Sequence, residues 1–325
     1  MDLAGKRPDL LEMRGAELEP LLGGKVVNFS SFPGGKSRLL WTFDLLRNGS
    51  VEPMVLLRET GYGPNFGTCF EMRREAGTLR GLWAAGMAVP QVHYISPEGD
   101  MLVMDRLAGR ADFTFDNEAK RLATVDVFVR TLAKLHALDV TKVDLGRQTA
   151  ADRRSGSLAD LADYERSYRG LCTPQDIIEE GLAWLRDHVP DDVGPASVLQ
   201  GDTGPTNFMH LDTHVTGLID WEMSHVGDPT DDLAWIWFRS SKLGFDHSIT
   251  AWLEAYQRHT GLAIDIDVLR YYAVFVVFRC TIACHVRRAN DPPYGDERPA
   301  QLRTMLAAAL ADVRGGSSHF LTDLV

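Results

Sequence analysis

The sequence predicts an α+β protein in which a strand-rich first third is followed by a helix-rich remainder. Up to about residue 105, short apolar runs alternate with turn residues, a pattern typical of strands. From residue 117 onward, apolar residues recur at helical spacing. Segregated strands and helices indicate the α+β class. The 325 residues suffice for one large or two modest domains, and we expect the division at residues 1–105 and 106–325.

The first third is expected to hold five strands and one helix behind a helical lead-in over residues 1–22. The strands are predicted at residues 25–29, 38–46, 52–59, 89–95 and 101–104. The helix is predicted over residues 70–86, with an apolar face made of Met72, Ala76, Leu79, Leu82 and Trp83. Glu75 falls on the same face, and a carboxylate on a buried face needs a partner.

The remainder is expected to be helical apart from one hairpin. Its first helix runs from residue 117 to about 139 and is predicted to bury Leu122, Val125, Val129, Leu132, Leu135 and His136. Further helices are predicted at residues 158–171, 174–188, 231–241, 246–260, 267–288 and 295–314. Asp228, followed by Pro229, is a suitable N-cap for the helix that starts near residue 231. Residues 315–325 are expected to be loosely ordered.

The stretch at residues 198–221 carries the main chemical signal. Residues 198–199 lead into a loop with Gly and Pro, after which residues 208–209 and 215–219 are predicted to form two strands joined by a turn at residues 210–214. This hairpin brings Asp202, Asn207 and Asp220 to one edge, an oxygen site that suits Mg²⁺ held partly by a substrate's phosphates. Asp and Asn also form turns on their own. However, D-x4-N followed by an Asp at a strand end is typical of phosphoryl transfer.

The composition disfavours some classes of partner. A net charge of -11 argues against a nucleic-acid-binding surface. The first residues contain no apolar run of signal-peptide length, and no segment reaches the roughly 18 apolar residues of a membrane span. The four cysteines form no C-x-x-C motif, which suggests free thiols in a reducing compartment. We therefore expect a cytoplasmic protein that binds neither nucleic acid nor membrane.

Three motifs resemble the aminoglycoside phosphotransferase / choline kinase-like family. They are QGDTGPTNFM at residues 200–209, LIDWE at residues 218–222 and GDPTDDLAW at residues 227–235. The resemblance implies a protein-kinase-like fold with a small β-rich N-terminal lobe and a larger helical C-terminal lobe. The first motif departs from the family because Gln200 stands where a His is usual, a residue that generally supports the loop.

The resemblance also implies an activity. The protein would transfer the γ-phosphoryl group of ATP, its co-substrate, to a hydroxyl of a small molecule, and Asp202 would accept the proton of that hydroxyl. Asn207 and Asp220 would hold Mg²⁺, and Asp228 would brace the loop that follows. The acceptor could be aminoglycoside-like, choline-like or a hydroxy acid.

A glycine-bearing turn at residues 30–37 is the predicted cover for the phosphates. Backbone N–H groups at Gly34, Gly35 and Ser37 could point toward them. The Gly-Lys-Ser run at residues 35–37 mimics a P-loop. A P-loop is excluded because Ser30 occupies the position of its first glycine and a strand follows instead of a helix.

Arg58 is the predicted phosphate-binding cation at the end of the third strand. In a kinase-like lobe this cation pairs with a helix glutamate, which would be Glu75. An arginine can bridge a phosphate and a carboxylate because its guanidinium presents several donors. Alternatively, Arg58 is a solvated charge at a strand end, and Glu75 pairs with Arg74 or Arg80.

Residues 104–109 resemble the hinge that joins the two lobes of a kinase. Backbone groups around Met104, Asp105 and Leu107 would meet the adenine ring there. The segment at residues 61–69 is rich in Gly, Pro and Asn and could lie over the bound nucleotide.

Two rival functions remain open. A nucleotide-binding pseudokinase, or a small-molecule binding module without turnover, would be favoured by the loss of Asp202, Asn207 or Asp220, and all three are present. A protein kinase would need a longer segment between Asp220 and the helix at residue 231. The predicted helices at residues 158–171 and 174–188 are acidic, which would suit either a cationic acceptor or a solvated surface.

Overall fold

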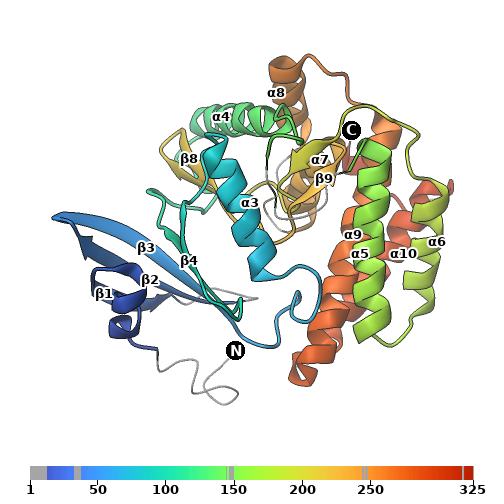
Figure 1. Cartoon of the computed structure of the whole chain (residues 1–325). Helices are drawn as coiled ribbons and strands as arrows, with labels where there is room; N and C mark the ends of the chain where they lie inside the picture. Colours follow the sequence, from blue (N-terminus) through green and yellow to red (C-terminus); the bar gives the residue numbers. More distant parts are fainter. Residues whose placement is uncertain are drawn as a thin grey trace.

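The computed structural model describes residues 13–32, 38–143, 145, 150–243, 245, 248–316 and 318–324. Its elements form two groups, a sheet with one long helix and a larger group dominated by helices (Figure 1). The five strands of the sheet come first in the chain, and most helices follow them. The predicted α+β class is therefore confirmed.

Five antiparallel strands form the sheet in the order β1-β2-β3-β5-β4. They are β1 (Lys25–Phe32), β2 (Arg38–Arg47), β3 (Ser50–Glu59), β4 (Val92–Ile95) and β5 (Met101–Asp105). Side chains alternate between the two faces of a strand. Met54 and Leu56 pack with Leu22 of α2 (Glu19–Leu22) on one face, whereas Leu57 and Leu102 join the main core on the other.

The helix α3 (Met72–Ala84) covers the core-facing side of the sheet. Its buried residues are Met72, Glu75, Ala76, Thr78, Leu79 and Leu82. The prediction that Trp83 shares this face is wrong, because the side chain is 48% exposed; consecutive helix residues are about 100° apart. The predicted helical lead-in over residues 1–22 is only partly covered by the structure. Residues 1–12 lie outside the described part of the chain, and residues 13–22 form only η1 (Gly15–Glu17) and the short α2.

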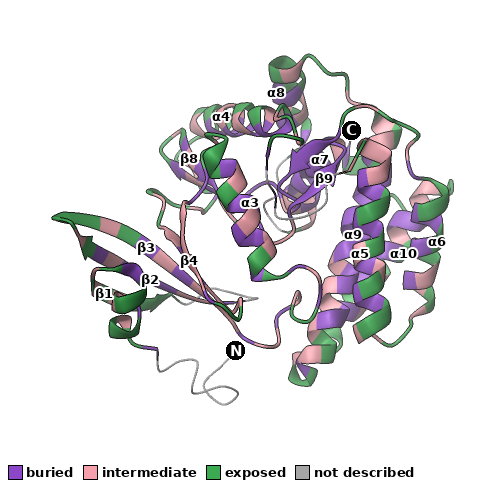
Figure 2. Ribbon diagram, in the orientation of Figure 1, coloured by how far each residue is buried: buried purple, intermediate pink, exposed green. Residues whose placement is uncertain are grey.

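The larger group is built around one long buried helix. Its helices are α4 (Glu118–His136), α5 (Arg153–Leu171), α6 (Asp176–Asp187), α7 (Thr230–Trp237), η2 (Phe238–Lys242), α8 (Thr250–Thr260), α9 (Ile266–Asn290), η3 (Pro292–Tyr294), α10 (Glu297–Val313) and η4 (Thr322–Leu324). The central helix α9 contacts α5, α6, α7 and α10 and is largely buried (Figure 2). A helix that is apolar on most sides is typical of a core. Among the described residues, no helix combines the length and apolar character needed to cross a bilayer.

Two small sheets connect these helices. The pair β7 (Phe208–Leu211) and β8 (His214–Leu218) is the predicted hairpin. The strand β6 (Ser197–Leu199) pairs with β9 (His225–Gly227), which the sequence did not predict. The expectation of a loose tail is wrong for residues 318–324. Leu321 and Leu324 are buried, and Asp323 accepts hydrogen bonds from Trp237 and Lys242.

In α4, one predicted core residue is misplaced. Asn117 caps the helix by accepting a 2.9 Å hydrogen bond from the Lys120 amide, as an N-cap residue does. Val125, Val129, Leu132 and the other predicted residues are buried. Leu122 is 40% exposed, so its assignment to the buried face is wrong.

Two glycines of α5 provide a test of this packing. A Cβ at position 156 would lie 2.3 Å from the Val226 carbonyl oxygen, whereas a Cβ at position 170 would meet no atom within 4 Å. We predict that Gly156→Ala lowers the free energy of unfolding by about 1–3 kcal/mol, because α5 must move away from β9. Gly170→Ala should raise the free energy of unfolding by up to about 1 kcal/mol, as alanine favours helix. Urea denaturation would measure both, and equal effects of the two substitutions would contradict the close approach.

Candidate active site

The loop between β6 and β7, here called the Asp202 loop (residues 200–207), is folded back on itself by its glycines. Gly201 has a φ of 82°, and a Cβ there would lie 2.1 Å from the Met223 carbonyl oxygen. The Asn207 amide donates a 3.1 Å hydrogen bond to the Gly204 carbonyl. The Ile219 amide in turn donates a 3.1 Å hydrogen bond to the Asn207 carbonyl. These contacts place Asp220 next to the loop, although it follows in the chain only after β8.

Asp202 is held through both carboxylate oxygens. One oxygen accepts a 2.8 Å hydrogen bond from the Asn207 side-chain amide, which also donates to the Asp202 carbonyl at 2.7 Å. The other oxygen lies 2.5 Å from the Arg239 guanidinium. The carboxylate keeps 18% of its surface exposed, so a small molecule can reach it. The structure thus brings Asp202 and Asn207 together as their spacing predicts.

Arg239 is a site residue that the sequence analysis missed. It lies in η2, a single π-helical turn after α7, and such turns are frequent at functional sites. Its guanidinium donates to the Pro205 carbonyl at 2.9 Å, to the Thr206 hydroxyl at 2.5 Å and to the Asn207 side-chain oxygen at 3.0 Å. No local motif marks this arginine, because it reaches the loop from more than thirty residues away in the chain.

Asp220 lies in a strained backbone conformation within an acidic cluster. Its φ is 65°, in the left-handed region that is costly for a residue with a Cβ. The residue is exposed to solvent, although protein atoms near the carboxylate keep part of its surroundings dry. Desolvation by that surrounding protein raises the pKa of Asp220 well above its ordinary value, and the charges of Glu222, Asp202 and Glu75 add to the increase. These carboxylates therefore repel one another unless a cation joins them.

Arg38 supplies part of the missing positive charge. Its guanidinium donates to Glu59 at 2.9 Å, forms an ion pair with Glu75, and approaches Glu222 to 3.6 Å. Burial lowers the pKa of Arg38, but attraction to Glu75, Glu222 and Glu59 outweighs burial and raises it. Its Nη2 is buried without a hydrogen-bond partner in the described part of the chain. One guanidinium faces several carboxylates, so the cluster keeps an excess of negative charge.

The predicted pair of Arg58 and Glu75 is not formed, and Arg38 takes the place assigned to Arg58. The reason is the alternation of side chains in β3. Arg58 shares a face with Met54 and Leu56, and its Nη1 lies 3.9 Å from the Met13 sulfur, on the side of the sheet away from α3. Arg38 pairs in register with Glu59, the next residue of β3, and so points to the α3 side.

The other predicted nucleotide contacts are only partly covered by the structure. Gly34, Gly35 and Ser37 lie outside the described residues. In the segment predicted as a hinge, the Asp105 and Arg106 amides donate to the Gln91 and Pro53 carbonyls at 3.0 and 2.9 Å. Within the described chain, the Leu107 amide makes no hydrogen bond.

Two buried carboxylates at the start of α7 connect the Asp202 loop to the core. The oxygens of Asp232 accept the Gln200 and Gly201 amides at 3.0 and 2.9 Å, and the His136 ring lies 3.0 Å away. Asp231 binds the buried Arg279 in bidentate fashion, with two contacts of 2.6 Å. Asp228 accepts the Thr230 amide at 2.8 Å just before the same helix. The prediction that Asp228 is the N-cap is wrong by one residue, because α7 begins at Thr230 and Pro229 occupies the N-cap position.

Gln200 shows how this chain holds its hairpin without the histidine that is usual at this position. Its side-chain nitrogen donates to the Asn207 carbonyl at 2.9 Å and to the Ile219 carbonyl at 2.6 Å. A histidine carries at most one hydrogen on each ring nitrogen, so it cannot donate both bonds from one atom. Gln200 thus ties the Asp202 loop to the strand that precedes Asp220.

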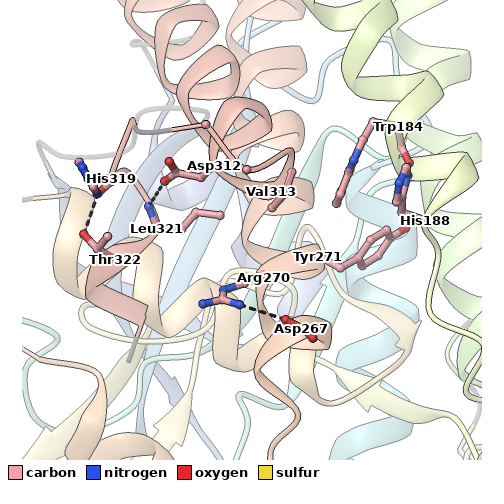
Figure 3. A pocket seen from close by; sticks show the side chains of 12 residues that line it. Trp184, His188, Asp267, Arg270, Tyr271, Asp312, Val313, His319, Leu321 and Thr322 are labelled. Carbon is pink, nitrogen blue, oxygen red and sulfur yellow. Dashed lines mark hydrogen bonds and ion pairs between the residues drawn. The ribbon is translucent and has the colours of Figure 1, made fainter.

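A hollow of about 640 Å³ lies elsewhere, between α6, α9, α10 and the chain end (Figure 3). None of the Asp202 loop residues lines it. Its charged side chains satisfy one another or the backbone: Arg270 pairs with Asp267 at 3.0 Å, and Asp312 accepts the Leu321 amide at 2.7 Å. The geometry of the acidic cluster therefore identifies the candidate active site better than the size of this hollow.

Comparison with known families agrees with this geometry. The profile of the phosphotransferase enzyme family matches residues 69–272, more than half of the chain. The chain belongs to the phosphotransferase enzyme family. The matched region contains α3, the Asp202 loop, Asp220 and Arg239 of the candidate site, and it ends within the first turns of α9.

Curated relatives of this phosphotransferase cover different shares of their own lengths. An aminoglycoside 3'-phosphotransferase of Niallia circulans is 29% identical over 202 residues, which make up 58% of this chain and 72% of the relative. Acyl-CoA dehydrogenase family member 11 of Gallus gallus is 28% identical over 209 residues, 60% of this chain and 26% of the relative. The chain thus matches only about a quarter of the length of this second relative.

Solved structures share the phosphotransferase fold. A thermostable mutant of aminoglycoside phosphotransferase APH(4)-Ia has a TM-score of 0.67 at 16% identity and covers 93% of this chain and 100% of its own. A choline/ethanolamine kinase family protein from Mesorhizobium loti has a TM-score of 0.60 at 19% identity and covers 95% and 97%. A mutant of the first enzyme in ternary complex with AMP-PNP and hygromycin B has a TM-score of 0.66 at 17% identity and covers 93% and 99%. The predicted kinase-like fold is confirmed.

The role of Gln200 can be tested by removing its donors. We predict that Gln200→Leu lowers the free energy of unfolding by about 1–3 kcal/mol, because the Ile219 carbonyl loses its side-chain donor and the Asn207 carbonyl keeps only the Ile219 amide. Gln175→Leu is the matched control, since the Gln175 side chain donates only to the neighbouring Pro174 carbonyl at the surface. Urea denaturation would compare the two, and a Gln200→Leu protein as stable as the control would refute the assigned role.

Proposed function

We propose that this phosphotransferase transfers the γ-phosphoryl group of MgATP to a hydroxyl group of a small molecule. The observation that carries the proposal is the Asp202 carboxylate, accessible yet fixed by Asn207 and Arg239, beside an acidic cluster centred on Asp220. In phosphoryl transfer the protein mainly positions the reacting oxygens and stabilises charge. A fixed carboxylate next to a cation site has the chemistry for both tasks.

Asp202 is the proposed base. Its two oxygens are oriented by different partners, so the carboxylate cannot rotate freely. The acceptor hydroxyl would donate its hydrogen to Asp202 and point its oxygen toward the γ-phosphorus. Arg239 touches the same carboxylate and the Asn207 side chain, so it would hold the loop in position as the phosphoryl group arrives.

Asn207 and Asp220 are the proposed ligands of Mg²⁺. The fit rests on the surplus of carboxylates at Asp220 and Glu222, which a divalent cation would relieve. Within the described residues, no cluster of three or more His, Cys, Asp or Glu side chains has the geometry to hold a metal alone. This suits Mg²⁺, which usually takes a few protein oxygens together with water and phosphates. When bound, it would neutralise charge on the phosphates.

The nucleotide would lie against the sheet, in a lobe proposed at residues 1–105. Arg38 is the proposed phosphate contact, because its Nη2 is buried without a hydrogen-bond partner in the described chain and faces the acidic cluster. The Leu107 amide is the proposed contact for adenine, since it makes no hydrogen bond within the described chain. The turn with Gly34, Gly35 and Ser37 remains the proposed cover of the phosphates.

Related proteins support the choice of co-substrate and acceptor type. A structural neighbour binds the ATP analogue AMP-PNP together with hygromycin B, a small molecule. A curated relative is an aminoglycoside 3'-phosphotransferase. ATP as the phosphoryl donor and a hydroxylated small molecule as the acceptor follow for this chain as parts of the proposal.

The proposal is tested with Asp220→Ala and Asp202→Asn. Wild type should gain thermal stability only when ATP and Mg²⁺ are present together, and Asp220→Ala should lose this gain because a metal ligand is missing. Asp202→Asn should keep MgATP binding but lower acceptor-dependent ADP release by about a hundredfold or more. Asp212→Asn, in the exposed turn of the β7–β8 hairpin, is the control. No stabilisation of wild type by MgATP, or full turnover in Asp202→Asn, would refute the proposal.

A second prediction separates the two arginines of the sheet. Arg38→Lys should raise the KM of MgATP by about tenfold, because lysine cannot reproduce the bidentate geometry of the guanidinium. Arg58→Lys should leave this KM unchanged, since Arg58 lies on the opposite face of the sheet. Steady-state kinetics with varied MgATP would measure both values. A larger effect at position 58 would overturn the placement of Arg38 in the nucleotide site.

A further inference from the structure

The acidic side chains of α5 and α6 are not available to attract a cationic acceptor, as the sequence suggested they could be. Nearly all of these side chains form ion pairs with arginines. The ion pairs join Asp160 to Arg279, Asp163 to Arg74 and Arg166, Glu165 to Arg169 and Arg186, Glu179 to Arg169, and Glu180 to Arg314. Of this set, only the exposed Asp176 has no ion pair within the described chain. The surface of α5 and α6 therefore carries little unpaired negative charge that could attract a positively charged molecule.

A different surface, formed by α9, η3 and the start of α10, carries two arginines. We call it the arginine face; it consists of Cys280, Cys284, Arg287, Tyr294 and Arg298. The first three are spaced by four and three residues on α9, so they share one side of the helix. Tyr294 of η3 lies over them, with its hydroxyl 3.6 Å from the Cys284 sulfur and its ring 4.5 Å from the Arg287 guanidinium.

The packing of α9 connects the arginine face with the turn that holds the proposed base. The helix α9 contacts η2, the turn that carries Arg239 to Asp202. Cys280 lies on the same helix, at one end of the arginine face. Burial raises the pKa of its thiol, the charge of Asp202 raises it further, and Arg298 and Arg239 oppose the increase. One thiol thus experiences the charges of both Asp202 and Arg298.

Among the described residues, Arg287 and Arg298 have none of the carboxylate partners that most of the other arginines have. The Nε of Arg287 is buried there without a hydrogen-bond partner. The Arg298 guanidinium donates to the neutral side chain of Gln301 at 2.6 Å, its one hydrogen bond within the described part of the chain. Their neighbours Arg288 and Arg303 both pair with Asp296, at 2.6 and 2.9 Å. A partly desolvated guanidinium without a counter-ion is costly, and a carboxylate or phosphate would satisfy it.

We propose that the acceptor of this phosphotransferase is an alcohol that also carries an anionic group, a carboxylate or a phosphate, which binds Arg287 and Arg298. The inference rests on the proposed function for the reaction itself. The acceptor oxygen forms a bond to the γ-phosphorus, and the bond between that phosphorus and the bridging oxygen of ATP breaks. Its electron pair leaves with ADP, and the hydroxyl proton passes to Asp202. The anionic group takes no part in the chemistry and fixes the position of the hydroxyl.

The test measures binding to the protein–MgADP complex, so that it does not depend on turnover. Isothermal titration would compare 3-hydroxybutyrate with its uncharged amide and with 4-amino-2-butanol. Glycerol 3-phosphate would be compared with glycerol in parallel, to distinguish a phosphate from a carboxylate. We expect at least one anion to bind about tenfold or more tightly than its uncharged counterpart, and the amine to bind weakest. Tighter binding of the amine, or equal binding within both pairs, would overturn the inference.

Variants then locate the binding site of the anion. Arg287→Gln and Arg298→Gln should each weaken binding of the preferred anion by about tenfold while the affinity for MgADP stays the same. Arg288→Gln is the matched control, because it removes a neighbouring charge whose partner Asp296 keeps Arg303. Anion binding that survives both substitutions, or a loss confined to MgADP affinity, would place these arginines outside the acceptor site.

The two proposals can fail separately. If the anion binds through Arg287 and Arg298 but ADP release does not respond to Asp202→Asn, the acceptor inference stands and the phosphotransfer proposal falls. If ADP release depends on Asp202 but only uncharged or cationic alcohols bind, the phosphotransfer proposal stands and the acceptor inference falls. Circular dichroism of each variant would confirm that its fold is intact, and Arg287→Lys offers a milder replacement that keeps the positive charge.

Discussion

The two carboxylates that open α7 hold the rest of the site in place. Asp232 gathers the Gln200 and Gly201 amides and the His136 ring, while Asp231 binds Arg279 of α9. Both are buried, and a buried charge is tolerated only when its hydrogen bonds are complete. These buried contacts join α7 to α9 and to the Asp202 loop. The position of Asp202 relative to the arginine face is therefore set by the core.

The charges around the candidate active site fall into two groups of opposite sign. Around Arg38, the carboxylates of Glu59, Glu75 and Glu222 exceed the positive charge, and Asp220 adds to the surplus. Such a surplus suits a divalent cation that arrives with phosphates. On the arginine face the surplus is positive. A molecule with a hydroxyl at one end and an anion at the other would bridge from Asp202 to this face, which gives it a defined orientation.

Sequence patterns predicted the elements well, and the site only where its residues are close in the chain. Asp202 and Asn207 lie five residues apart, so their contact follows from one loop. The partner of Glu75 was misplaced because helical and strand patterns do not reveal which face of β3 turns toward α3; a shift of one residue exchanges the faces. Arg239 and β9 were missed because their contacts are tertiary. The order of residues 318–324 arises from Asp323, whose partners Trp237 and Lys242 are distant in sequence.

Net charge is a weak guide to the acceptor because it counts residues and ignores their pairing. The chain has a formal charge of -11, which at first suits a cationic molecule. In α5 and α6, however, most of the carboxylates considered for that role are neutralised by arginines. Two opposite charges at short range nearly cancel, so their electrostatic field at a ligand is weak. Water and dissolved salt screen this field further. A ligand responds to the unpaired charge near its binding site. On the arginine face this unpaired charge is positive and comes from Arg287 and Arg298.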